Sequence, residues 1–420
     1  MAQAQLSSII SKLHLRLMPT LLMMYVLAFL DRANVGFAKQ GLEADAGIGV
    51  AAFAFGASIF FIGYALLEVP SNLILHRVGA RVWLARIMVT WGLISAATAF
   101  VEGPTSYYIV RFLLGMAEAG FFPGVIYYLT YWYPASARAR SVGIFFYGAP
   151  LALTFGGPLS GQLVAHDAFG LHGWQIMFII EGLAASLGGI AVLFLLKDGP
   201  QKAPWLSDDE KQLLQAELQK DDAGREHAGV LHTLRNPRIL FLALVYFLIQ
   251  AGFYGLTFFL PTQIARLLGK NVGLEVGLVS AIPWAAALVA VTVIPRWCDA
   301  RGNARGVGAL ALGVAGCALA ASALTTSPVL AMIALTIAAS GLIVAPAMFW
   351  TMPTAILTGA AAAGGIGLIN AIGNLGGFAA PNLRAWLDAV FANHTAGLLG
   401  LCVVCLIGAC CYAVAPRAPR

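Results

Sequence analysis

The sequence predicts an all-α membrane protein with twelve transmembrane helices arranged as two pseudo-symmetric six-helix bundles. Of its 420 residues, 60% are hydrophobic and 10% are charged, whereas roughly 25% of residues are charged in a soluble domain. Apolar segments repeatedly reach the ~20 residues that a helix needs to cross a bilayer. The alternating ten-residue pattern of membrane β-barrels is absent, which favours helices over a barrel.

The apolar segments form two groups of six, separated by one long polar stretch. The candidate spans are 18–38, 50–74, 82–101, 105–130, 141–165, 174–196, 238–260, 274–295, 307–325, 329–352, 361–383 and 394–415. We therefore expect an N-terminal bundle over 1–196, a cytoplasmic linker over 197–237 and a C-terminal bundle over 238–420. Within the linker, Ser207 and Glu210 have the spacing of a capping box, which predicts a short helix ending near Lys220.

Basic residues are distributed unequally between the two sides that these spans define. If the N-terminus is cytoplasmic, twelve of them lie in short inner segments and four in outer loops. The inner residues are Lys12, Arg16, Arg77, Arg81, Arg86, Arg138, Arg140, Arg296, Arg301, Arg305, Arg417 and Arg420, and the outer ones are Lys39, Arg266, Lys270 and Arg384. The positive-inside rule then predicts that both termini are cytoplasmic. The pI near 9.0 reflects this orientation, and no basic stretch indicates nucleic-acid binding.

Four charged residues lie inside predicted spans of the first half: Asp31, Arg32, Arg111 and Glu118. A charge at bilayer depth costs at least ~2.5–3.5 kcal/mol and is a functional candidate by default. We expect no ionisable residue well inside a span of the second half. Two acids and two bases, neutral together, indicate a buried charge relay and hence transport.

The spacing of these charges suggests their roles. Arg111 and Glu118 are seven residues apart, on one helical face about 10 Å apart along the axis, too far to pair directly. Asp31 and Arg32 diverge by about 100°, so at most one points straight at a central cavity. Our hypothesis is that Asp31 and Glu118 carry protons. Arg32, which stays protonated, binds a substrate carboxylate, and Arg111 is an exchangeable ion-pair partner. A purely structural network is the alternative.

Other polar side chains within the spans are weaker candidates. We expect Glu68 and Glu181 to be structural, with Glu68 capping a helix or pairing with Arg77 or Arg81. Amides, hydroxyls and an indole around a cavity suit a polyhydroxylated ligand, although amides and glycine runs equally suit close helix packing. The candidate substrate-binding residues of this kind are Tyr64, Tyr147, Gln250, Tyr254, Trp350, Asn370 and Asn374.

Two loops about 223 positions apart share a glycine turn flanked by arginines. One contains Arg77, Gly79 and Arg81, and the other contains Asp299, Arg301 and Gly302. We expect them to lock neighbouring helix ends in one conformation and release them in another, as in transporters built from paired repeats. These loops resemble the cytoplasmic loop signature of the major facilitator superfamily, although the first copy has Asn72 and His76 at its leading Gly and Asp.

A wider resemblance covers essentially all twelve spans. It is carried by Leu30-Asp31-Arg32-Ala-Asn34, Tyr64 through Asn72, Arg111 through Gly124, Trp132-Tyr-Pro134, Phe349 through Thr354 and Ile369 through Gly377. These segments resemble the anion:cation symporter family of the major facilitator superfamily. Tyr25 through Arg32, Gly148 through Thr154 and Phe259 through Gln263 are most similar to bacterial sugar-acid transporters of the rhamnonate type.

The resemblance implies proton-coupled symport of a small organic anion across the bacterial inner membrane. Asp31 and Glu118 match the coupling acids of the family, and Arg32 matches its substrate arginine. A sugar acid such as an aldonate is the implied substrate, but Ala149 stands where galactonate carriers place a Gln, so either Tyr147 or Asn370 replaces it or the substrate carries fewer hydroxyls. An aromatic or dicarboxylic acid (phthalate, hydroxyphenylacetate or tartrate type), sodium coupling and exchange are the alternatives. We expect a monomer in the bilayer, with no cofactor besides the proton.

Two other classes of membrane protein are disfavoured. An enzyme is unsupported because all seven histidines lie in loops, termini or span ends, which leaves no buried bis-histidine or HExxH site, and no glycine-rich phosphate loop follows a strand. We therefore expect neither a metal site nor catalysis. A passive channel needs no proton carrier, so the buried acids favour a transporter.

Overall fold

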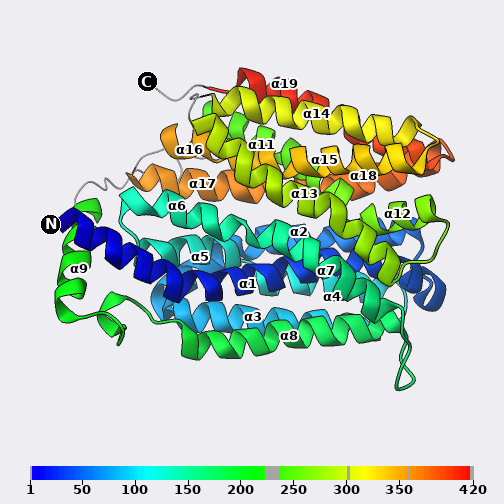
Figure 1. The fold of residues 1–420 in the computed structure, drawn as a ribbon. Coiled ribbons are helices and arrows are strands. Elements are labelled where there is room, and N and C mark those ends of the chain that lie inside the picture. Colours follow the sequence, from blue (N-terminus) through cyan, green and yellow to red (C-terminus); the bar gives the residue numbers. More distant parts are fainter. Residues whose placement is uncertain (1, 223–235, 300–302, 357–358, 417–420) are drawn as a thin grey trace.

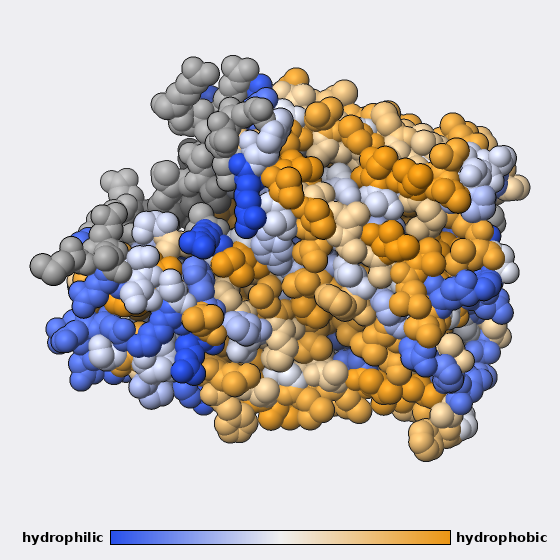
Figure 2. All heavy atoms as spheres, viewed as in Figure 1, coloured by the Kyte–Doolittle hydropathy of each residue, from blue (hydrophilic) through white to orange (hydrophobic). Residues whose placement is uncertain are grey.

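The computed structural model describes residues 2–222, 236–299, 303–356 and 359–416 of the chain (Figure 1). Its named elements are helices, and eleven of those described are long and apolar enough to cross a membrane. Figure 2 shows hydrophobic residues across the middle of one face of the molecule and hydrophilic residues toward both ends, as a bilayer-spanning protein requires. The prediction of an all-α membrane protein is confirmed.

The first half of the chain forms one layer of helices. Its elements are α1 (Ala2–Ala46), α2 (Val50–Val78), α3 (Ala80–Ala97), η1 (Thr98–Phe100), α4 (Pro104–Glu118), α5 (Phe121–Thr130), α6 (Ala135–Phe146), α7 (Gly148–Val164) and α8 (Gly173–Leu195). The predicted span 105–130 consists of α4 and α5, which are divided at Gly120. This residue has φ +85°, a left-handed conformation that glycine adopts without strain.

The second half forms the other layer, above the first in Figure 1. Its elements are α11 (Pro237–Thr257), α12 (Leu260–Leu268), α13 (Leu274–Asp299), α14 (Ala304–Leu324), α15 (Pro328–Phe349), α16 (Thr351–Ile356), α17 (Gly359–Asn374), α18 (Gly376–Val390) and α19 (His394–Val414). The predicted span 361–383 is not one helix, because α17 and α18 meet at Leu375. These two helices are each too short to cross a bilayer alone, so this span is not among the eleven.

The described ends of the chain lie at the same end of the molecule (Figure 1). We call this end the terminal face and the opposite end the far face. The linker elements η2 (Pro200–Lys202) and α9 (Asp208–Asp222) lie at the terminal face beside the start of α1. That the terminal face is cytoplasmic stays a prediction.

The two halves pack tightly where α7 meets α13, near the far face. A Cβ atom added to Gly277 would lie 2.3 Å from the carbonyl oxygen of Gly157, and one added to Gly161 would lie 2.5 Å from that of Gly273. These approaches are closer than any real Cβ contact, and the atoms met belong to the backbone. The glycines therefore let the two helices touch, and we call this contact the seam.

Replacing Gly277 by alanine is expected to separate the halves at the far face, because the added methyl group has no room against the backbone of α7. In a variant whose native cysteines are replaced, maleimide labelling of a cysteine at Thr257 should become several-fold faster. Gly313→Ala is the matched control, since its added Cβ would meet the Cβ of Ala409 at an ordinary 3.5 Å. Equal labelling rates in the two variants would contradict this role for the seam.

The linker helix α9 is tied to α1 by a charge pair. Lys12 Nζ donates to Glu210 Oε2 at 2.9 Å, and Ser207 and Glu210 form the predicted capping box: the Ser207 amide donates to Glu210 Oε2 at 2.8 Å and the Glu210 amide donates to Ser207 Oγ at 3.2 Å. The hydrogen bond from Lys12 lowers the pKa of the Glu210 carboxyl. The pair therefore stabilises docking above the usual pKa of a glutamate, and this contribution is lost as pH falls through the lowered pKa.

Replacing Glu210 by glutamine should weaken the docking of α9 on α1 at neutral pH, as acid does, because it removes the charge that Lys12 pairs with. We expect faster hydrogen–deuterium exchange in the backbone of 203–220 and unchanged transport. Glu217→Gln, which removes a half-buried carboxylate that pairs with Lys220 inside the same helix, is the control. Equal exchange in both variants would show that the Lys12–Glu210 pair does not hold α9.

Candidate transport site

Arg32 lies at the centre of the molecule in a cage of aromatic rings. Its Nε donates to Glu118 Oε1 at 2.8 Å, and its Nη1 donates to the Tyr254 hydroxyl at 3.0 Å. The rings of Phe29, Phe60 and Tyr64 lie with their centroids 5.3–5.4 Å from the guanidinium carbon. The ion pair is buried, so desolvation makes it costly to break without a replacement partner. Because Tyr254 belongs to the second half, the cage joins both halves.

The first-half members of this cage lie at one depth. The far-face end of α1 is Ala46, and α2 and α4 begin at the same face at Val50 and Pro104. Arg32, Tyr64 and Glu118 stand at equal offsets along the chain from these three ends, which places each roughly four helical turns, or about 21 Å, from the far face. The sequence-predicted candidates Arg32, Glu118, Tyr64 and Tyr254 are therefore brought together near mid-depth.

Arg111 lies beside this cage without pairing with Glu118. Its Nη2 donates to the backbone oxygen of Ala57 at 3.3 Å, and its guanidinium carbon lies 5.4 Å from the centroid of the Phe60 ring. Its Nε and Nη1 are buried and make no hydrogen bond within the described chain. Arg111 thus retains donors for another anion, while Glu118 is held by Arg32.

Asp31 points away from the Arg32 cage and into the first half. Its Oδ2 accepts from Trp91 Nε1 at 2.7 Å and its Oδ1 accepts from Ser95 Oγ at 3.0 Å, both on α3. Asn34 Nδ2 lies 3.5 Å from Asp31 Oδ1 and donates to Glu181 Oε2 at 2.9 Å. The expected single relay of four charges is therefore divided into an Arg32–Glu118 pair and a separate Asp31 network.

The second half supplies amides around the cage. Gln250 Nε2 donates to Asn374 Oδ1 at 3.2 Å, and Asn370 Nδ2 donates to Glu68 Oε1 at 2.7 Å. Glu68 therefore bonds across the two halves, and the expected pairing with Arg77 or Arg81 is wrong. The reason is that Glu68 is buried, facing α17.

The other predicted residues have different surroundings. The Trp350 ring packs edge-on against Tyr246 at 5.0 Å, and Tyr147 is half-buried at the junction of α6 and α7. In the first of the two predicted switch loops, Arg77 is exposed near the end of α2. Gly79, with φ +96°, connects α2 to α3, and Arg81 lies in the first turn of α3. Asp299 is the last residue of α13, with its side chain outside the described part, and Arg301 and Gly302 lie outside the described residues.

The second half contains a buried charge just beyond the end of the predicted span 361–383. Arg384 is 2% exposed in α18, where Nη1 donates to the Gly255 oxygen at 3.2 Å and Nη2 donates to Gln263 Oε1 at 3.0 Å. Lys39 is likewise buried within α1. The expectation that both lie in outer loops is wrong, because α1 and α18 extend beyond the apolar segments that define the predicted spans.

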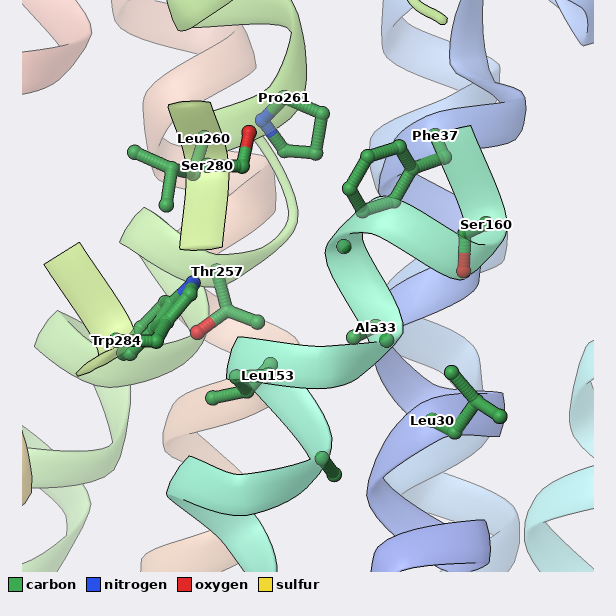
Figure 3. A pocket seen from close by; sticks show the side chains of 13 residues that line it. Leu30, Ala33, Phe37, Leu153, Ser160, Thr257, Leu260, Pro261, Ser280 and Trp284 are labelled. Atoms are coloured by element: carbon green, nitrogen blue, oxygen red, sulfur yellow. The ribbon is translucent and has the colours of Figure 1, made fainter. Parts of the chain in front are cut away.

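A small pocket lies between the halves, lined by residues of α1, α7, α11, α12 and α13 and by none of the cage (Figure 3). The first half contributes residues of α1 and α7, including Phe37 and Ser160, and the second half contributes Thr257, Pro261 and Trp284. Its lining is mostly apolar with a few hydroxyls.

The sequence and the fold of the chain both match known proteins. Residues 21–381 match the Major Facilitator Superfamily. The chain belongs to this family. It is 47% identical over 409 residues to the inner membrane transport protein RhmT of Escherichia coli K12, covering 97% of this chain and 95% of that protein. It is 45% identical over 406 residues to a putative tartrate transporter of Agrobacterium vitis, covering 96% and 90%.

A solved structure shares the fold of this member of the superfamily. It is a bacterial homologue of the human lysosomal transporter Spinster in an inward-facing, unoccupied conformation, with a TM-score of 0.73 and 17% identity over 98% of this chain and 97% of the other. The family resemblance that the sequence indicated is therefore confirmed. The chain is a membrane transporter and not an enzyme.

Proposed function

We propose that the protein is a proton-coupled symporter that takes up a small organic anion by alternating access. The observation that carries this proposal is the buried Arg32–Glu118 pair inside an aromatic cage to which both halves contribute. In this proposal the protein is a monomer of the bacterial inner membrane with both termini in the cytoplasm. The proton is its coupling ion, and no cofactor takes part. The glycine–arginine loops act as conformational switches at the terminal face.

Coupling follows from charge balance at Arg32. A substrate carboxylate that binds the guanidinium displaces Glu118, whose carboxylate then lacks its cation in an apolar site. Protonation of Glu118 removes that charge, so the anion and a proton enter together and the site stays neutral. Arg111, with two unused donors, is placed to receive a second oxygen of the substrate or the released Glu118.

The neutral side chains near the cage support a hydroxylated anion such as an aldonate. Tyr254 reaches Arg32 directly, and Gln250, Asn370 and Asn374 present amides from α11 and α17. Hydroxyl groups can donate to and accept from such amides. A dicarboxylic hydroxy acid is the second candidate, favoured by the relative named a tartrate transporter and by the free donors of Arg111.

The test is uptake by purified protein in proteoliposomes, with and without an imposed inward proton gradient. Rhamnonate and tartrate are the first radiolabelled substrates, followed by phthalate and hydroxyphenylacetate. Accumulation that collapses when a protonophore is added supports proton symport. Accumulation driven equally by a sodium gradient, or exchange alone, would overturn the coupling, and uptake of none of these acids would overturn the substrate class.

A further inference from the structure

Glu181 is a buried carboxyl group to which the proposed coupling at Arg32 assigns no role. It is 1% exposed in α8, near the middle of that helix. Ser160 Oγ donates to its Oε1 at 2.7 Å, and Asn34 Nδ2 donates to its Oε2 at 2.9 Å. Within the described residues it forms no ion pair, so two neutral donors are its hydrogen-bond partners. A carboxylate is far less stable in such a place than a carboxylic acid.

Asp31 lies close to Glu181 through the same amide. Asn34 Nδ2 is 2.9 Å from Glu181 Oε2 and 3.5 Å from Asp31 Oδ1. One nitrogen atom therefore bridges the two carboxyl groups, and their oxygens are no farther apart than the sum of these two distances. Asp31 forms no ion pair in the described chain either. Two negative charges this close in an apolar interior repel each other strongly, which favours a proton on one of them.

The remaining atom of the amide points to the same conclusion. Asn34 Oδ1 is buried and accepts no hydrogen bond within the described structure. Both neighbouring acids, when ionised, can only accept, so neither satisfies this oxygen. A protonated carboxyl has an O–H group, so a bound proton supplies a donor of the kind that this oxygen lacks while both acids are ionised.

The network also reaches the space between the halves. Ser160, which donates to Glu181, lines the pocket in Figure 3 opposite Thr257 and Trp284 of the second half. The pocket lies beside the seam, where the halves separate in an alternating-access cycle. A proton can therefore pass between water in an opened pocket and Glu181 through the Ser160 hydroxyl, which both donates and accepts.

We propose that Glu181 is a proton-carrying group of the transport cycle and acts with Asp31 through their shared amide, Asn34. This inference rests on the proposed proton coupling. The step is a simple protonation: one proton from water adds to a carboxylate oxygen to give a carboxylic acid, and it leaves again to water. No bond to substrate forms. The charged or titratable group that acts on Glu181 is Asp31 on α1, and Ser160 on α7 donates to it. Asp31 is in turn acted on by Glu118 and Arg111 on α4 and accepts from Trp91 and Ser95 on α3.

The test compares wild type with Glu181→Gln in proteoliposomes, using the anion that wild type accumulates best. The readout is the highest accumulation ratio at an imposed difference of about two pH units, where each coupled proton contributes a factor of about 100. Loss of one coupled proton should lower this limit about 100-fold in Glu181→Gln. Exchange of internal for external substrate, which needs no net proton movement, should persist within about threefold.

Two further variants separate this role from a structural one. Ser160→Ala keeps both carboxyls and should alter the pH profile of uptake without lowering the accumulation limit, whereas Ser186→Ala, one to two turns along α8, should change neither. An unchanged limit and pH profile in Glu181→Gln would overturn the inference. So would loss of exchange together with accumulation, and, if Glu181→Gln does not fold, an unchanged profile in Ser160→Ala. Wild-type uptake that no proton gradient drives would overturn the proposed coupling itself, and the inference with it.

Discussion

Replacing Arg32 by glutamine is expected to abolish transport of any anion that the protein carries. The substitution leaves Glu118 buried without its cation and removes the donor to Tyr254. Orphaning the buried Glu118 destabilises the fold, and truncating one partner of a buried charge pair between protein and ligand costs about 2–5 kcal/mol of binding free energy, a loss of affinity of about 30-fold or more. Uptake and exchange should both disappear, because the loss falls on binding and not on coupling alone.

The measurement is substrate binding and exchange by purified Arg32→Gln in proteoliposomes, with thermal stability recorded in parallel. Arg32→Lys keeps the charge but loses the planar fork that contacts Glu118 and Tyr254 together, so we expect it to restore folding more fully than transport. Arg86→Gln is the matched control, since Arg86 stacks on Trp83 with its guanidinium carbon 3.8 Å from the ring centroid, away from the cage. Wild-type exchange by Arg32→Gln would exclude Arg32 as the anion ligand.

Much of the fold and the centre of the site follow from the sequence because their physical causes are local. Apolar segments of bilayer length predict helices wherever they occur. A charge inside such a segment is costly, so Arg32 and Glu118 are candidates from their position in the chain alone. The depth that Tyr64 shares with them comes from the structure, because the observed helix ends, and not the predicted spans, put all three residues at the same offset from the far face.

The features that the sequence does not predict depend on how helices are rotated and paired. Adjacent residues on α1 face different partners, so Asp31 joins α3 while Arg32 joins α4 and α11. The bond between Glu68 and Asn370 joins residues 302 positions apart, and no local signal marks such a pair. Hydropathy predicts a loop at Arg384 because the apolar segment ends before it, although α18 continues to Val390.

The second large effect is expected for Asp31→Asn, which should lower the limit of accumulation by the contribution of one coupled proton, about 100-fold at a difference of two pH units, and leave exchange intact. Asparagine fills the same space and keeps an oxygen for Ser95 or Trp91, but it cannot take up and release a proton. Because Asp31 points away from Arg32, its loss should leave anion binding within about threefold of wild type, which separates this variant from Arg32→Gln.

The measurement pairs gradient-driven uptake with substrate exchange in the same Asp31→Asn proteoliposomes, and Ser95→Ala serves as a control that alters the hydrogen bond and keeps the acid. An unchanged accumulation limit would remove Asp31 from the coupling. Loss of exchange as well would place Asp31 in the anion site, contrary to its orientation toward α3.

If accumulation falls in both Asp31→Asn and Glu181→Gln while exchange survives in both, protons bind on one side of α1 and the anion binds on the other. Coupling would then require α1 to transmit the change from one side to the other, and the Asp31–Arg32 peptide, with its side chains in two separate networks, is the shortest connection between them.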